Sequence, residues 1–189
     1  DRAIETFLEL IRINSPSKHE RGVADYVKPK LNALGFDVQE DDTGAKISGD
    51  AGNVIAFKKG SVPGARRLLL SCHMDTVEPT DKLNIVIDGD EIRSDGTTIL
   101  GSDDKAGIAA VLEGVRSVLE RNAPHGDLRI IFSVSEEIGL LGARSLNCSN
   151  AEADLGYVFD THKPVPGITV SAPHHENIIV EVHGKAAHA

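Results

Sequence analysis

The 189-residue sequence has only two cysteines, Cys72 and Cys148, which lie far apart. They cannot form a disulfide framework, so we expect a reducing compartment, the cytoplasm. Clusters of basic residues are also missing: 29 acidic residues outnumber 20 basic ones, and this charge balance argues against nucleic acid as a partner.

No apolar run reaches membrane-spanning length, and residues 1–11 are acidic and amphipathic rather than typical of a signal peptide. An initiator Met is absent, so we expect a few residues to precede this sequence.

The hydrophobic residues, 40% of the chain, are enough to bury a sizeable core. Apolar residues at helical spacing predict helices over 4–11, 17–34 and 105–121, whereas short apolar runs predict strands over 53–57, 66–73, 128–135 and 155–160. Nearly all-apolar strands separated by helices predict an α/β fold whose sheet is mixed, mostly parallel and covered by helices on both faces.

Two local signals refine these predictions. Ser17 and Glu20 have the spacing of a capping box, which would begin the second helix. The stretch 83–94 predicts a β-hairpin that turns at Asp88-Gly89. Lys105, at the start of the long helix, could simply balance the acidic residues beside it.

A histidine and an aspartate stand at the end of the strand over 66–73. Residues i and i+2 of an extended chain point to the same face, so His73 and Asp75 can lie side by side while Cys72 and Met74 face the other way. His73 and Asp75 could therefore share a proton or a metal ion.

Further acidic residues follow the other strands or begin the long helix. Ligands of open α/β sheets bind outside the carboxyl ends of the strands, so we expect these acids to meet there. Two carboxylates about 4 Å apart repel by roughly 4 kcal/mol at an effective dielectric constant near 20, so the group needs protons or cations. A histidine among them favours zinc over magnesium or calcium. The acids are Asp103, Asp104, Glu136, Glu137 and Asp160.

Each of these residues also has a simpler interpretation. His73 could be a hydrogen-bonded histidine at the core boundary, and Asp103 and Asp104 could cap the long helix. Glu136 and Glu137 could be solvated loop residues, and Asp160 could cap a turn. Their joint occurrence at strand ends is the reason to favour a metal site.

Five ordered motifs carry a resemblance to a known family: "HMDTV", "DGTTILGSDDKAG", "SVSEEIGLLGAR", "FDTHKP" and "GKAAHA". They resemble the dinuclear zinc peptidases that include peptidase T, carboxypeptidase G and aminoacylase, and the second motif is most similar to the peptidase T branch. The resemblance implies two zinc ions. Asp103 would bridge them, His73 and Asp160 would complete the first site, and Glu137 would bind the second.

The same resemblance implies three catalytic roles. Asp75 would orient His73, and Glu136 would act as the general base. His188 would reach across a dimer to stabilise the oxyanion of the tetrahedral intermediate.

The resemblance also implies a domain organisation. Residues 1–175 would form the amino-terminal part of the catalytic domain, and residues 176–189 would begin an inserted lid or dimerisation domain that breaks off. Relatives supply a last metal-binding histidine near the end of a longer chain, and no residue here matches it. We therefore expect this stretch alone to bind at most one zinc tightly and to be inactive.

The predicted function is that of a zinc-dependent exopeptidase resembling peptidase T, which hydrolyses the amino-terminal bond of short peptides and forms a homodimer through the lid domain. One alternative is a related amidohydrolase that acts on acylated amino acids or on carboxyl-terminal residues. Another is a metal-binding protein without catalytic activity. No nucleic acid or membrane partner is expected.

Overall fold

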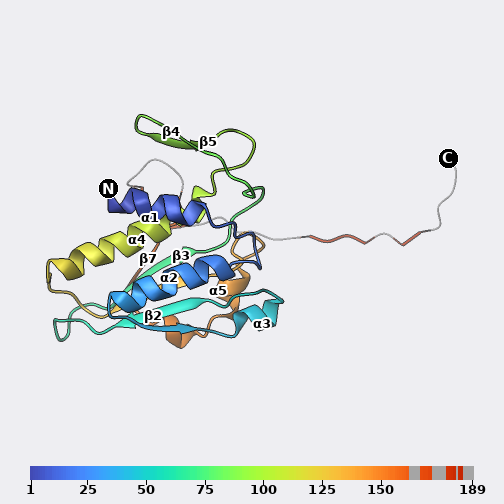
Figure 1. Ribbon diagram of the computed structural model, residues 1–189. Helices are drawn as coiled ribbons and strands as arrows, with labels where there is room; N and C mark the ends of the chain where they lie inside the picture. The colour runs from blue at the N-terminus through green and yellow to red at the C-terminus, as the bar shows by residue number, and fades with distance from the viewer. Residues whose placement is uncertain (162–166, 172–177, 182, 185–189) are drawn as a thin grey trace.

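A five-stranded sheet forms the centre of the computed structural model, which describes residues 1–161, 167–171, 178–181 and 183–184 (Figure 1). The strand order is β1-β2-β6-β3-β7. β3 pairs in parallel with β6 and β7, whereas β2 pairs antiparallel with β1 and β6, so β2 alone runs against the other four. The predicted α/β fold with a mixed, mostly parallel sheet is confirmed. The strands are β1 (Asp37–Glu40), β2 (Val54–Lys58), β3 (Leu68–His73), β6 (Leu128–Ser133) and β7 (Leu155–Val158).

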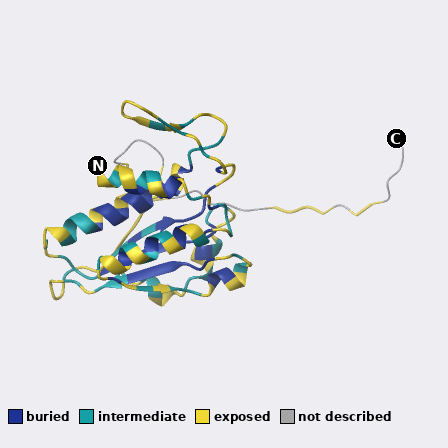
Figure 2. Cartoon of the chain, viewed as in Figure 1, coloured by how far each residue is buried: buried dark blue, intermediate teal, exposed yellow. Residues whose placement is uncertain are grey.

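Three long helices pack against one face of this sheet: α1 (Arg2–Ile11), α2 (Arg21–Ala33) and α4 (Ser102–Glu120). Alternate strand residues enter the same core cluster as the apolar stripes of the helices, which Figure 2 shows as the buried inner sides of the ribbons. Burying each large apolar side chain contributes about 1.5–3 kcal/mol. The cluster includes Leu10, Val23, Val27, Leu31, Leu70, Cys72, Ile108, Leu112, Ile130 and Phe132.

The opposite face of the sheet contacts shorter elements. Arg129 alternates with the core residue Ile130 and therefore points to this second face. Its Nη1 donates hydrogen bonds to the carbonyls of Ser149 (3.2 Å) and Asn150 (2.8 Å). These two residues belong to the 3-10 helix η1 (Cys148–Ala151), so helical segments lie on both faces, as predicted. The remaining short helices are α3 (Thr43–Ile47) and α5 (Leu141–Ser145).

A separate two-stranded sheet projects from the body of the molecule (Figure 1). It consists of β4 (Ile85–Asp88) and β5 (Glu91–Ser94). Asp88 pairs with Glu91, which places Gly89 and Asp90 in the turn, one residue later than predicted. Gly89 has a φ of 60°, a left-handed value that glycine adopts without steric cost.

The predicted capping box is wrong. Glu20 is the N-cap residue of α2, but its side chain makes no capping hydrogen bond. Ser17 instead donates to Asp75, and the Glu20 carboxylate accepts from the backbone of Lys18 and Ser135. Ser17 and Glu20 thus form hydrogen bonds with residues that are distant in the sequence, and not with each other's backbone.

The predicted domain boundary between residues 175 and 176 lies outside the described residues, as does His188. None of the helices in the described part combines the length and apolar composition needed to cross a membrane.

Candidate metal centre

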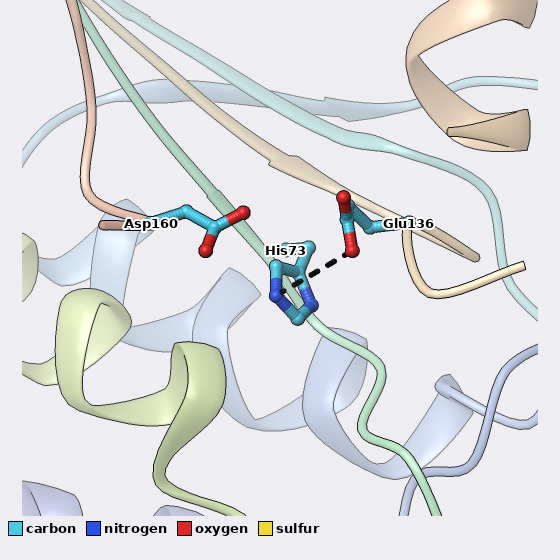
Figure 3. A group of neighbouring side chains, drawn as sticks. All are labelled: His73, Glu136 and Asp160. Carbon is cyan, nitrogen blue, oxygen red and sulfur yellow. Dashed lines mark ion pairs between the residues drawn. The ribbon is translucent and has the colours of Figure 1, made fainter. Parts of the chain in front are cut away.

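Three neighbouring strands bring acidic residues and a histidine to one edge of the sheet. β3 ends at His73, Glu136 and Glu137 follow β6, and Asp160 follows β7. Because β6, β3 and β7 are adjacent and parallel, their carboxyl ends lie at the same edge. Figure 3 shows the side chains of His73, Glu136 and Asp160 converging from these three segments.

The possible metal-binding atoms fall into two groups that share His73. One consists of His73, Glu136 and Asp160, and the other of His73, Asp103 and Glu137; within each group the ligand atoms lie within 4.8 Å of one another. His73 Nε2 is 3.2 Å from Asp103 Oδ1 and 4.0 Å from Glu136 Oε2. The structure thus brings all four predicted metal-binding residues together, and it also places the predicted base, Glu136, within reach of a metal ion.

Asp75 lies behind the His73 ring and is completely buried. His73 Nδ1 is 2.9 Å from the Asp75 carbonyl oxygen and 3.4 Å from its carboxylate Oδ1. A proton on Nδ1 would satisfy either acceptor and would leave Nε2, which faces the acidic cluster, free to bind a metal. The sequence predicted the carboxylate contact but not the shorter one to the carbonyl.

Asp75 also holds the turn that follows β6. Its Oδ1 accepts a hydrogen bond from the Glu136 amide (2.9 Å), and its Oδ2 accepts one from the Glu137 amide (3.2 Å) and one from the Ser17 hydroxyl (2.6 Å). One buried carboxylate therefore connects the ends of two strands and the chain before α2. The i, i+2 spacing of Asp75 from His73 did not predict these hydrogen bonds.

Adjacent aspartates at the start of α4 have opposite surroundings. The Asp103 side chain is 65% exposed, whereas Asp104 is buried at 3%. Both have non-helical backbone angles, and the peptide bond between them is cis. A Cβ added to Gly107 would lie only 2.2 Å from Asp104 Oδ1, so the glycine of the sequence "DDKAG" makes room for this carboxylate.

The pKa values at this edge reflect burial first and the charges of neighbouring carboxylates second. Burial would lower the pKa of His73, but the hydrogen bond and charge of Asp75, with the charges of Asp104 and Glu136, raise it to about 10. Burial raises the pKa of Asp104 to about 7 and also raises the pKa values of Glu136 and Glu137. A cation at this edge would stabilise the ionised carboxylates.

Residues 53–162, which contain His73, Asp75 and all the acidic residues grouped around them, match the family model described as peptidase family M28. The match covers more than half of the chain. This protein belongs to peptidase family M28.

Several proteins resemble this M28-family chain over most of its length. A Bacillus subtilis protein named uncharacterized protein YqjE is 41% identical over 188 residues, which are 100% of this chain and 50% of that protein. Aminopeptidase PepT from Bacillus cereus superimposes with a TM-score of 0.82 at 39% identity, and a Staphylococcus aureus tripeptidase with a TM-score of 0.81 at 40% identity. Each structural match covers 86% of this chain and 43% of the other. The chain thus spans about half the length of these relatives, and the predicted resemblance to zinc peptidases related to peptidase T is confirmed.

Lys105 of the M28-family chain does not balance the neighbouring acids. It is completely buried, and its Nζ donates a hydrogen bond to the carbonyl of Ile13. Burial lowers the pKa of this amino group to about 8. Lys105 therefore holds the chain that follows α1, a role that its position beside two aspartates did not indicate.

Proposed function

We propose that the complete protein is a zinc-dependent exopeptidase that releases the amino-terminal residue of short peptides. The observation that carries this proposal is the convergence of His73 with the carboxylates of three other segments at the edge of the sheet. The similar solved structures are named aminopeptidase and tripeptidase, which supports short peptides as substrates.

The residues at this edge fit zinc. Imidazole nitrogen and carboxylate oxygen are common zinc ligands, and the cluster has too few cations for its acids. We infer that two ions bind: His73, Asp103 and Asp160 would hold one, and Asp103 and Glu137 would hold the other. Zinc held there would polarise a peptide carbonyl and make water more acidic.

The protein's own groups would manage the protons. Glu136 would accept a proton from the attacking water and return it to the departing amine, and its raised pKa suits both steps. Asp75 would keep His73 and the Glu136-Glu137 turn in place. His188 would stabilise the oxyanion that develops on the carbonyl oxygen.

The remaining proposals concern the whole protein. Residues 1–175 would belong to the catalytic domain, and residues 176–189 would begin a lid domain through which two copies pair. The free Cys148 is exposed, which suits a reducing compartment, and we propose the cytoplasm.

Glu136→Gln in the complete protein tests the proposal. Hydrolysis of a tripeptide should fall by about 100- to 10,000-fold because the general base is lost, while the zinc content stays unchanged. Glu152→Gln is the matched control, since Glu152 is 65% exposed and lies 3.7 Å from Arg67. Loss of zinc in Glu136→Gln would make Glu136 a metal ligand instead of the base. A wild-type protein that binds zinc but cleaves only acylated amino acids would be an amidohydrolase, and one that cleaves nothing would contradict an enzymatic function.

A further inference from the structure

The segment between α1 and α2 reaches the metal centre although it supplies none of the predicted site residues. It runs beside the chain that follows β3, where Pro16 and Thr76 form a parallel bridge. The Ser15 hydroxyl donates to the Met74 carbonyl (2.9 Å), and the Thr76 amide donates to the Ser15 carbonyl (3.0 Å). With the contact from Lys105 to Ile13, these bonds fix the first half of the segment.

Glu20 fixes the second half. This carboxylate is completely buried, and its Oε1 accepts hydrogen bonds from the Lys18 amide (2.8 Å), the Ser135 amide (2.9 Å) and the Ser135 hydroxyl (3.1 Å). Ser135 has a left-handed φ of 51° and directly precedes Glu136. Glu20 thus ties the segment to the turn that aims the two glutamates.

Ser17 lies between these two anchors and donates the shortest hydrogen bond that Asp75 accepts. Without this 2.6 Å bond, Asp75 Oδ2 would keep only the 3.2 Å bond from the Glu137 amide. Rotation of a carboxylate about its last side-chain bond has broad energy minima, so hydrogen bonds decide its angle. That angle sets where Oδ1 meets the His73 ring and the Glu136 amide.

We propose that Ser17 is a positioning residue of the metal centre: its hydroxyl fixes the Asp75 carboxylate, which in turn fixes His73 and the Glu136-Glu137 turn. The proposal rests on the zinc binding inferred above. Ser17 itself need touch neither metal nor substrate. A merely structural role for its hydroxyl would affect folding stability without affecting metal affinity.

The test compares three variants of the complete protein by zinc titration against a competing chelator and by thermal melting of the metal-free form. Ser17→Ala should weaken zinc binding by about 10-fold, the lower end of the roughly 10- to 100-fold loss expected for Asp75→Ala. Ser17→Thr keeps a hydroxyl and should restore affinity to within about threefold of wild type. Ser15→Ala is the matched control, because it removes a hydroxyl that anchors the same segment to a carbonyl and not to Asp75. It should lower the melting temperature and leave zinc affinity unchanged.

Wild-type zinc affinity in Ser17→Ala would overturn the proposal. Equal weakening in Ser15→Ala or in Ser17→Thr would also overturn it, because the effect would then come from the segment's stability and not from the hydroxyl on Asp75. Neither readout requires peptide cleavage. A protein that binds zinc but hydrolyses no peptide would refute the proposed function while this comparison still decides the role of Ser17.

Discussion

Glutamates occur in two clusters of charged residues whose surroundings shift the carboxylate pKa values in opposite directions. Glu40, on β1, accepts hydrogen bonds from Arg21 Nη1 (2.9 Å), Lys28 Nζ (2.6 Å) and the Gly52 amide (3.0 Å). The Arg21 hydrogen bond outweighs burial and lowers the pKa of Glu40 to about 2. In the candidate metal centre, burial outweighs the charge of His73 and raises the pKa values of Glu136 and Glu137.

The difference separates a cluster that stabilises the fold from one that is suited to a ligand. The Glu40 carboxylate has its countercharges within the protein, so it joins α2 to β1 without any added ion. The carboxylates around His73 outnumber the cations available to them, so ionising all of them costs free energy that a divalent ion would offset. The following predictions test this contrast, from the largest expected effect to the smallest.

Asp103→Ala should have the largest effect. If Asp103 lies between two ions, its removal should weaken zinc binding at both sites by more than the roughly 10- to 100-fold typical of a group that only supports a ligand. Metal analysis by mass spectrometry after dialysis measures this. Asp95→Ala is the control, since Asp95 is exposed and accepts hydrogen bonds from Thr97 in its own turn. Two ions retained at wild-type affinity in Asp103→Ala would remove Asp103 from the ligands.

Zinc binding should remove the loss of stability at high pH that His73 causes in the metal-free protein. The pKa of His73 is raised from 6.5 to about 10 in the metal-free protein, so its contribution to stability is complete below pH 6.5 and is lost as the pH rises through 10. The free energy of unfolding of the metal-free protein should fall by about 1–3 kcal/mol as the pH rises from 6.5 to 10. Zinc competes with protons for the imidazole, so the stabilisation by zinc should grow over the same range. Melting curves at several pH values, with zinc and with chelator, measure both slopes; parallel slopes would contradict binding at His73.

Glu40→Gln should have the smallest effect and should leave zinc affinity unchanged. The pKa of Glu40 is lowered from 4.5 to about 2, so its ionic contribution is present above pH 4.5 and is lost as the pH falls through 2. Because Arg21 is 38% exposed, we expect a loss of only about 1–2 kcal/mol at pH 7 and almost none at pH 2. Urea unfolding at the two pH values checks this. If Glu40→Gln lowered the free energy of unfolding equally at pH 7 and at pH 2, packing and not charge would account for the contribution of Glu40.

The sequence allowed prediction of the elements and of the edge where the acids meet, because both follow from patterns of neighbouring residues. Apolar periodicity located the helices, and acids after parallel strands had to converge. The roles of Ser17 and Glu20 could not be predicted, since their partners lie 58 and 115 positions away in the sequence. A local rule, the capping box, gave the wrong partners for both. The role of His188 stays a prediction.

The interior position of β3 has a consequence for motion. Most of this strand is hydrogen-bonded on both sides, to β6 and to β7, and the Met74 amide continues the ladder by donating to the Ser133 carbonyl. Such a strand opens only with large-scale unfolding, so its amide protons should exchange with deuterated water far more slowly than those of the β4–β5 hairpin. The His73 backbone should thus stay still, and any motion at this edge of the sheet should come from side chains and from the segments that follow the strands.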